Sequence, residues 1–240
     1  MVLVAMISPR ESHYLGHLGP VPLYVHWSAI GMLVMAFMWS QHGSGFDASA
    51  FLMVLTVLLM GLILHELGHG LTARALGATG VTITLWAFGG LCQSHRDQTP
   101  PREFLIVAAG PAVSVALAAI GYFSYSYLKG NQSELVLDHG QLTLLGDFLI
   151  TTGWINTSLA IFNLLPIFPL DGGQLVYNGA LMITRNHLLV RKICLTLSVF
   201  GALGVILLQF YLSGYQLTNN IFLTGFIMFW LVSDAYRYLR

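Results

Sequence analysis

Charged side chains are scarce in this sequence of 240 residues. Asp, Glu, Lys and Arg make up only 8% of the chain and 56% of the residues are hydrophobic, whereas about a quarter of a typical soluble domain is charged. Acidic and basic residues are balanced at ten each, so the chain lacks the basic surface that nucleic acid binding requires. We therefore expect an integral membrane protein that contacts the lipid bilayer and binds no nucleic acid.

Cysteine is scarce as well. The two cysteines, Cys92 and Cys194, are far apart in the sequence. This spacing fits neither a disulfide framework nor a zinc ribbon, which uses closely paired cysteines. Any metal site in this chain must therefore be sought among histidine and carboxylate side chains.

Long apolar runs, in contrast, occur six times. A helix that crosses a bilayer needs about 20 apolar residues, and the expected spans are about 23–39, 50–76, 103–128, 142–165, 193–212 and 221–238. The last two come from one stretch without charge, which as a single helix would be about twice as long as the bilayer is thick. Polar residues between Ser213 and Asn220 mark the point where it folds back. The expected fold class is an all-α polytopic membrane protein with six transmembrane helices.

The positions of Lys and Arg test this topology independently, because these residues accumulate in cytoplasmic loops. With six spans and a cytoplasmic amino terminus, only Lys129 falls outside. The residues that fall inside are Arg10, Arg74, Arg96, Arg102, Arg185, Arg191, Lys192, Arg237 and Arg240. We therefore expect both termini to be cytoplasmic.

Three ionisable side chains lie in the second span, where each is costly and indicates a functional site. The segment LILHELGHG contains His65, Glu66 and His69. Residues i and i+4 share a helix face, so the two imidazoles can bind one zinc ion while Glu66 reaches a water there as general base. This HExxH pattern is typical of metalloproteases. A chance match is the alternative, but two imidazoles and a carboxylate cannot simply be solvated inside a membrane.

A catalytic zinc usually takes three protein ligands, so one more ligand is expected at the same depth. The second span runs inward, which places the histidine pair near its cytoplasmic end. Asp147 is at the outer end of the fourth span, and the surroundings of Asp234 suggest an ordinary helix end at the head groups. Asp171, just past the inner end of the fourth span, is suitably placed.

Asp171 belongs to the segment NLLPIFPLDGG, in which the helix must break. Pro166 and Pro169 interrupt it, and broken backbone at membrane depth is tolerated only where it is buried in protein or lines a water-filled cavity. Asn163, at the start of the segment, can offer its amide to a substrate carbonyl or to a developing oxyanion. A helix-packing amide is the alternative interpretation of Asn163.

HELGH in the second span together with NLLPIFPLDGG after the fourth resembles the site-2 protease family of intramembrane zinc metalloproteases. The segments GPVPLYVHWS, FGG at 88–90 and AAGP at 108–111 are also similar, so the resemblance covers about residues 20–235. It implies His65, His69 and Asp171 as ligands of one zinc per chain, Glu66 as catalytic base and Asn163 as a substrate or transition-state contact. The family often has an asparagine shortly after the AGP turn, where this sequence has Ser114.

The sequence resembles the compact members of that family, because it shows neither a PDZ-like insertion nor a nucleotide-sensing domain. We therefore expect residues 1–240 to form a single integral-membrane metalloprotease domain. Its expected location is a prokaryotic plasma membrane, with the active site toward the cytoplasmic side. A separate membrane protein is then a candidate regulator.

Residues 79–93, TGVTITLWAFGGLCQ, show the alternation typical of a half-buried strand. Val81, Ile83 and Leu85 alternate with polar or aromatic residues, and Gly89 and Gly90 permit a turn. We expect a short membrane-associated β hairpin or re-entrant segment after the second helix. It could be a structural plug, or an edge strand that pairs with an unwound substrate.

Together these features predict an intramembrane zinc endopeptidase that hydrolyses a peptide bond within a transmembrane segment of a client protein, as in regulated intramembrane proteolysis. The alternative is a non-hydrolytic metal-binding membrane protein or a metal transporter. Transporters often have two related halves with helices broken in matching places, and the sequence shows no such repeat. A third alternative is an inactive scaffold that keeps zinc to stabilise its fold.

The predicted topology can be tested with reporters fused at four positions. Reporters after Gly130 and after Ser213 should be extracytoplasmic, whereas reporters after Asp97 and after Arg240 should be cytoplasmic, because the cations follow this arrangement. Alkaline phosphatase and green fluorescent protein activities report the two sides. A cytoplasmic signal after Ser213 would show that the last two spans are paired wrongly.

Overall fold

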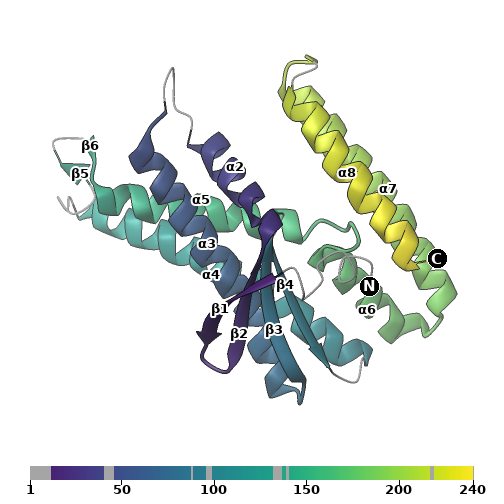
Figure 1. Cartoon of the computed structure of the whole chain (residues 1–240). Coiled ribbons are helices and arrows are strands. Elements are labelled where there is room, and N and C mark those ends of the chain that lie inside the picture. The colour runs from purple at the N-terminus through teal and green to yellow at the C-terminus, as the bar shows by residue number, and fades with distance from the viewer. Residues whose placement is uncertain are drawn as a thin grey trace. The chain divides into compact units, whose positions relative to one another are not determined.

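The computed structural model describes residues 12–40, 46–87, 89–95, 99–131, 137–138, 141–216 and 219–239. In chain order the elements are β1 (Ser12–Leu18), β2 (Val21–His26), the 3-10 helix η2 (Trp27–Ala29), α2 (Ile30–Trp39), α3 (Ala48–Ala75), β3 (Thr79–Trp86), β4 (Gly89–His95), α4 (Pro100–Gly130), β5 (Leu137–Asp138), β6 (Gln141–Leu142), α5 (Leu144–Asn163), α6 (Asp171–Thr184), α7 (His187–Leu212) and α8 (Asn219–Leu239). They form two compact units, which Figure 1 labels by element. We call residues 7–97 and 109–161 the sheet unit, and residues 1–6, 98–108 and 162–240 the C-terminal unit.

Among the described residues, four helices are long and apolar enough to cross a membrane: α3, α4, α5 and α7. They coincide with four of the predicted spans, at 50–76, 103–128, 142–165 and 193–212. Helix α2 has only 10 residues, and α8, with 21 residues, is not among the four. The prediction of six transmembrane helices is thus supported for four spans and stays a prediction for the first and the sixth.

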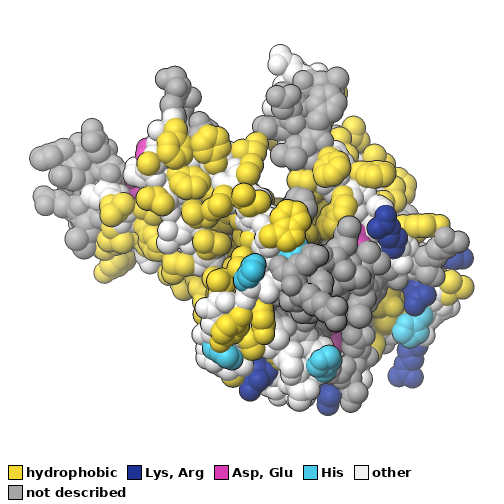
Figure 2. All heavy atoms as spheres, viewed as in Figure 1, with side chains coloured by type: hydrophobic (Ala, Val, Ile, Leu, Met, Phe, Trp, Pro, Cys, Tyr) yellow, Lys and Arg dark blue, Asp and Glu magenta, His cyan; other side chains and the backbone are white. Residues whose placement is uncertain are grey.

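The helices expose many large apolar side chains, as expected for surfaces that lipid covers. Phe123 on α4 is 75% exposed, Phe200 on α7 is 67% exposed and Phe229 on α8 is 73% exposed. Figure 2 shows hydrophobic side chains over much of the visible surface of the helices. In water such surfaces would mark an interface or an aggregation site, so they agree with the low charge of the sequence.

The predicted start of the first span, at residue 23, is wrong. Residues 23–26 belong to strand β2, and the helix begins only at Ile30. The physical reason is an alternation that a hydropathy window averages away: Val21 and Leu23 are buried while Pro22 and Tyr24 are partly exposed. A strand of this kind needs partners on both sides, and β2 has them.

The sheet is larger than the sequence suggested, so the chain is mostly helical but not all-α. Its four strands lie in the order β1-β2-β3-β4; β2 and β3 are parallel, and the other neighbours are antiparallel. The predicted hairpin at 79–93 is confirmed as β3 and β4, in which Trp86 pairs with Gly89. Phe88, part of the FGG segment, lies outside the described residues. Helix α3 contacts both β3 and β4.

Glycines allow the helices of the sheet unit to pack closely. A Cβ atom at Gly68 of α3 would lie 2.8 Å from the carbonyl oxygen of Ala109 in α4. A Cβ atom at Gly121 of α4 would lie 2.6 Å from the carbonyl oxygen of Leu149 in α5. Small residues at such contacts let backbones approach where lipid supplies no hydrophobic force between helices.

The C-terminal unit contains α6, α7 and α8, and α7 packs along α8 (Figure 1). The predicted break between the last two spans is confirmed, because α7 ends at Leu212 and α8 begins at Asn219. The Ser213 hydroxyl bonds to the carbonyls of Phe210 and Gln216, both at 2.8 Å. Helix α6, which follows the broken segment directly, was not predicted.

The close contact between α4 and α5 predicts a cost for adding one methyl group. Gly121→Ala should lower the free energy of unfolding by about 1–3 kcal/mol, as overpacking typically does, because the new Cβ meets backbone atoms that cannot move alone. Gly204→Ala in α7 is the matched control, since no heavy atom lies within 4 Å of its added Cβ. Unfolding in detergent measures both, and equal stabilities would contradict the packing argument.

Candidate metal centre

Helix α3 carries the histidine pair deep inside an aliphatic segment. The helix is well defined at both ends: the Asp47 side chain accepts hydrogen bonds from the backbone N–H groups of Ser49 and Ala50, and Arg74 lies in the last turn. A carboxylate at the N-cap and a cation in the last turn both interact favourably with the helix dipole. His65 is 2% exposed and His69 is 8% exposed, so both rings are held in the protein interior.

The two imidazoles converge on one point. The Nε2 atoms of His65 and His69 lie 3.2 Å apart, and the rings are nearly perpendicular, with centroids 4.9 Å apart. Two nitrogen ligands of a tetrahedral zinc, each about 2.0–2.1 Å from the metal, are about 3.3 Å apart. The pair therefore fits a zinc ion without rearrangement.

The other nitrogen of His65 is tied to helix α4. Its Nδ1 atom lies 2.9 Å from the hydroxyl oxygen of Ser114, which is completely buried. If Nδ1 carries the proton and donates it to this hydroxyl, Nε2 keeps its lone pair for a metal. Such partners of the second ring nitrogen fix the tautomer and the orientation of histidine ligands.

Helix α4 passes the pair at a glycine. A Cβ atom at Gly110 would lie 2.2 Å from His69 Nε2 and 2.7 Å from His65 Nε2. Both distances are too short for any residue with a side chain at this position. Gly110 belongs to the AAGP segment at 108–111, to which the sequence alone assigns no role. Only this contact explains why a residue without a side chain is needed there.

Glu66 lies beside the first residues of strand β4. Its side chain is 7% exposed, and a Cβ atom at Gly90 would lie 2.2 Å from Glu66 Cγ and 2.7 Å from Glu66 Oε1. The strand backbone thus runs directly past the carboxylate. In the described sheet β4 is an end strand, so the carboxylate is next to a sheet edge.

Asp171 and Asn163 bracket the broken segment of the C-terminal unit. Asn163 is the last residue of α5 and is partly buried, and Asp171 is the first residue of α6 and is 8% exposed. The chain turns so tightly there that a Cβ atom at Gly172 would lie 2.2 Å from the Leu164 carbonyl oxygen. The two glycines after Asp171 are therefore required by backbone contact.

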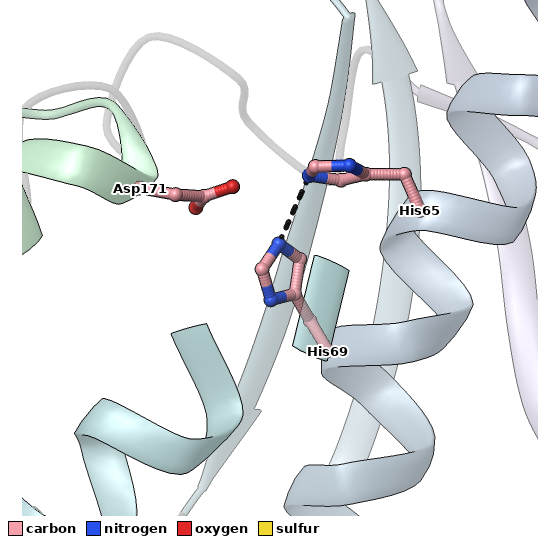
Figure 3. Close-up of side chains that lie close together, drawn as sticks. All are labelled: His65, His69 and Asp171. Carbon is pink, nitrogen blue, oxygen red and sulfur yellow. Dashed lines mark hydrogen bonds between the residues drawn. The ribbon is translucent and has the colours of Figure 1, made fainter. Parts of the chain in front are cut away.

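His65 and His69 belong to the sheet unit, and Asp171, the third side chain that the sequence predicts as a metal ligand, belongs to the C-terminal unit. Figure 3 draws the three side chains and marks the contact between the His65 and His69 Nε2 atoms. Two imidazoles and one carboxylate are a ligand set that catalytic zinc sites use.

Comparison with known proteins adds family evidence. The family model described as peptidase family M50 matches residues 51–144 and 135–207. A protein of Mycobacterium tuberculosis named as the zinc metalloprotease Rip3 is 32% identical over 182 residues, which is 70% of this chain and 43% of that protein. A protein of Synechocystis sp., also named as a zinc metalloprotease, is 34% identical over 181 residues, 72% of this chain and 45% of that protein. This chain thus spans less than half the length of either relative.

A solved structure has a similar fold. The site-2 protease from Methanocaldococcus jannaschii superposes with a TM-score of 0.62 at 24% identity, and the match covers 95% of both chains. At this identity the likeness supports the fold alone. It nevertheless extends over nearly all of the chain, so the arrangement of helices and sheet is that of a known fold.

The contact between Ser114 and His65 predicts an effect on metal affinity. Ser114→Ala should weaken zinc binding about 10- to 100-fold, the usual effect of removing a partner of a metal ligand, and Ser114→Thr should retain most of the affinity. Ser126→Ala, at an exposed position of the same helix, is the control. Chelator competition measures the affinities, and wild-type affinity in Ser114→Ala would mean that the hydroxyl does not orient His65.

Proposed function

Because this chain belongs to peptidase family M50, the site-2 protease family of zinc metalloproteases, we propose that it is an intramembrane zinc endopeptidase. Its substrate would be a peptide bond within a transmembrane segment of a client protein. The observation that carries this proposal is the convergence of the His65 and His69 Nε2 atoms, 3.2 Å apart, in a helix of membrane-spanning length that also carries a carboxylate beside them.

We propose His65, His69 and Asp171 as the ligands of one zinc ion per chain. The 3.2 Å separation of the His65 and His69 Nε2 atoms, the burial of all three side chains and the Ser114 contact of His65 support this set. Zinc bound there would polarise the scissile carbonyl and lower the pKa of a water molecule. The Ser114 hydroxyl would orient the His65 ring, and the Gly110 backbone would leave room for both imidazoles and the metal.

Glu66 is the proposed catalytic base. It follows His65 directly on α3, and its carboxylate is buried beside the β4 backbone. It would accept the proton that water loses as the oxygen attacks the carbonyl carbon, and would return that proton to the amine nitrogen as the peptide bond breaks. One carboxylate could serve both steps because returning the proton regenerates the base.

Strand β4 is proposed to present the substrate. A peptide bond in a transmembrane helix is shielded, because its N–H and C=O groups are bonded within the helix. Pairing with an edge strand would hold the substrate extended and expose its carbonyls. Support comes from Gly90, where the β4 backbone passes Glu66 closely enough to exclude a side chain, so a strand paired with β4 would run near the base. Asn163 is proposed as a donor to a substrate carbonyl or to the oxyanion.

Residues 1–240 are further proposed to act as one metalloprotease domain in a prokaryotic plasma membrane. In this arrangement both termini are cytoplasmic and the site faces the cytoplasmic side. The excess of Lys and Arg in the predicted inner loops supports this orientation. A client with a single span and a separate regulatory membrane protein are the partners that this architecture accommodates.

Substitution of Glu66 separates proteolysis from metal binding or transport. Glu66→Gln should reduce cleavage of a single-span client at least 10²- to 10⁴-fold, the usual contribution of a general base, while zinc content stays near one per chain. His65→Ala, His69→Ala and Asp171→Ala should lose zinc and activity together. Glu134→Gln, in a predicted extracytoplasmic loop, is the matched control for the loss of a carboxylate.

Co-expression with tagged clients and elemental analysis of the purified protein measure the two quantities. Cleavage by Glu66→Gln at nearly the wild-type rate would exclude Glu66 as the base. If neither protein cleaved any client and both moved zinc across a vesicle membrane equally well, the transport interpretation would replace the protease.

A further inference from the structure

Helices α7 and α8 carry none of the proposed ligands, yet they hold the segment that leads to Asp171. This segment, residues 164–170, joins α5 to α6 without regular secondary structure. Several of its N–H groups bond within the segment or to the end of α5, such as Leu165 to the Phe162 carbonyl at 3.3 Å and Leu170 to the Ile167 carbonyl at 2.9 Å. These short local bonds define its turns but do not anchor it to the rest of the unit.

The anchor is a side chain of α7. The backbone N–H of Phe168 donates to the hydroxyl oxygen of Ser198 at 2.9 Å, and the Ser198 hydroxyl donates in turn to the Cys194 carbonyl at 2.7 Å. Ser198 is completely buried. Since a buried backbone N–H without a partner is costly, this hydroxyl determines where the Phe168 peptide can lie.

Apolar contacts also hold Ile167 and Phe168, the two residues that the Phe168 peptide group joins. Ile167 is completely buried and packs with Ala202, Met228 and Leu231 of α7 and α8. Phe168 is 4% exposed and packs in a second cluster. The buried members of that cluster are Leu181, Val190, Cys194, Ala235 and Leu239.

Helix α7 also provides the space that Ile167 needs. A Cβ atom at Gly201 would lie 2.9 Å from Ile167 Cγ1. Gly201 is three residues after Ser198, on the same face of the helix. The seat for the segment is therefore built from one hydroxyl, one glycine and two apolar clusters.

A displacement of the Phe168 peptide would also displace Asp171. A Cβ atom at Gly173 would lie only 2.5 Å from the Phe168 backbone nitrogen and 2.7 Å from the Ile167 carbonyl oxygen. The first turn of α6 is thus packed directly against the anchored peptide, with no side chain between them. Asp171 begins that turn, so its carboxylate cannot keep its place if the peptide moves.

We propose that Ser198 is a positioning residue for the Asp171 carboxylate, and that the α7–α8 pair controls metal affinity through the Phe168 peptide. The inference rests on the proposed role of Asp171 as a zinc ligand. Ser198 touches neither metal nor substrate; it acts by accepting the Phe168 N–H and thereby setting the start of α6.

The test compares variants of Ser198 in the full-length protein in detergent. Ser198→Ala should weaken zinc affinity about 10- to 100-fold, as loss of an outer partner of a metal ligand does, and should change the visible absorption of the cobalt-substituted protein. Ser198→Thr, which keeps the hydroxyl, should restore affinity to within about threefold of wild type on the same scale. Thr196→Val, at an exposed position two residues earlier, is the control.

Thermal unfolding of the metal-free proteins separates positioning from general destabilisation. If Ser198→Ala does not fold, Gly201→Ala is the second variant, because its Cβ pushes Ile167 while leaving the hydroxyl intact; it should weaken zinc binding similarly. Wild-type affinity and cobalt spectrum in folded Ser198→Ala or Gly201→Ala would overturn the proposal. Asp171→Ala distinguishes failure of the proposed ligand set from failure of the positioning role of Ser198. If Asp171→Ala binds zinc as tightly as wild type, Asp171 is not a ligand, and Ser198 cannot control metal affinity through it.

Discussion

Two imidazole nitrogens held 3.2 Å apart inside an aliphatic helix are the constraint on which the rest of the sheet unit depends. Two lone pairs facing each other in a medium of low polarity repel unless a cation or a proton lies between them. Two neighbouring residues of α4 help to satisfy this constraint. The Ser114 hydroxyl contacts the far nitrogen of His65, and Gly110 leaves the space in front of both Nε2 atoms empty of side chain. The helix, the hydroxyl and the glycine form one arrangement, and none of them is explained alone.

The part of the site that sequence could predict is the part that lies within single segments. His65, Glu66 and His69 are related by helix geometry alone, so their pattern predicts their side-chain arrangement before any tertiary structure is known. The break before Asp171 could be predicted for the same reason, because proline excludes a continuous helix. Ser114 and Gly110 could not be assigned a role, because their contacts are with residues of α3 that lie between 41 and 49 positions away in sequence. A glycine in a membrane helix has many explanations, and only the distance to His69 selects one.

The same distinction explains the errors in the fold. The hairpin at 79–93 is a local feature and was predicted, whereas β2 is held by a parallel partner, β3, from beyond two helices. Hydropathy assigned residues 23–26 to a span because it sums apolar residues without regard to period. Helix α6 was not predicted for a related reason. The prolines before it end one helix, and the short segment LDGG contains no pattern that predicts the start of another. Long-range pairing and close packing, rather than composition, decide these elements.

The position of Glu66 bears most directly on the choice between hydrolysis and simple metal binding. A carboxylate in the membrane-spanning part of a helix is expensive, and the proposed zinc ligands, two imidazoles and an aspartate, do not include it. Here the carboxylate is also held beside the backbone of an end strand, at a glycine where any side chain would collide with it. A storage or transport site has no use for a base next to a sheet edge. A protease that must first unwind a helix would use both the sheet edge and the base. The edge would hold the extended peptide, and the base would accept the proton of the water that attacks that peptide. The pairing of Glu66 with Gly90 is therefore better explained by peptide hydrolysis than by metal binding alone.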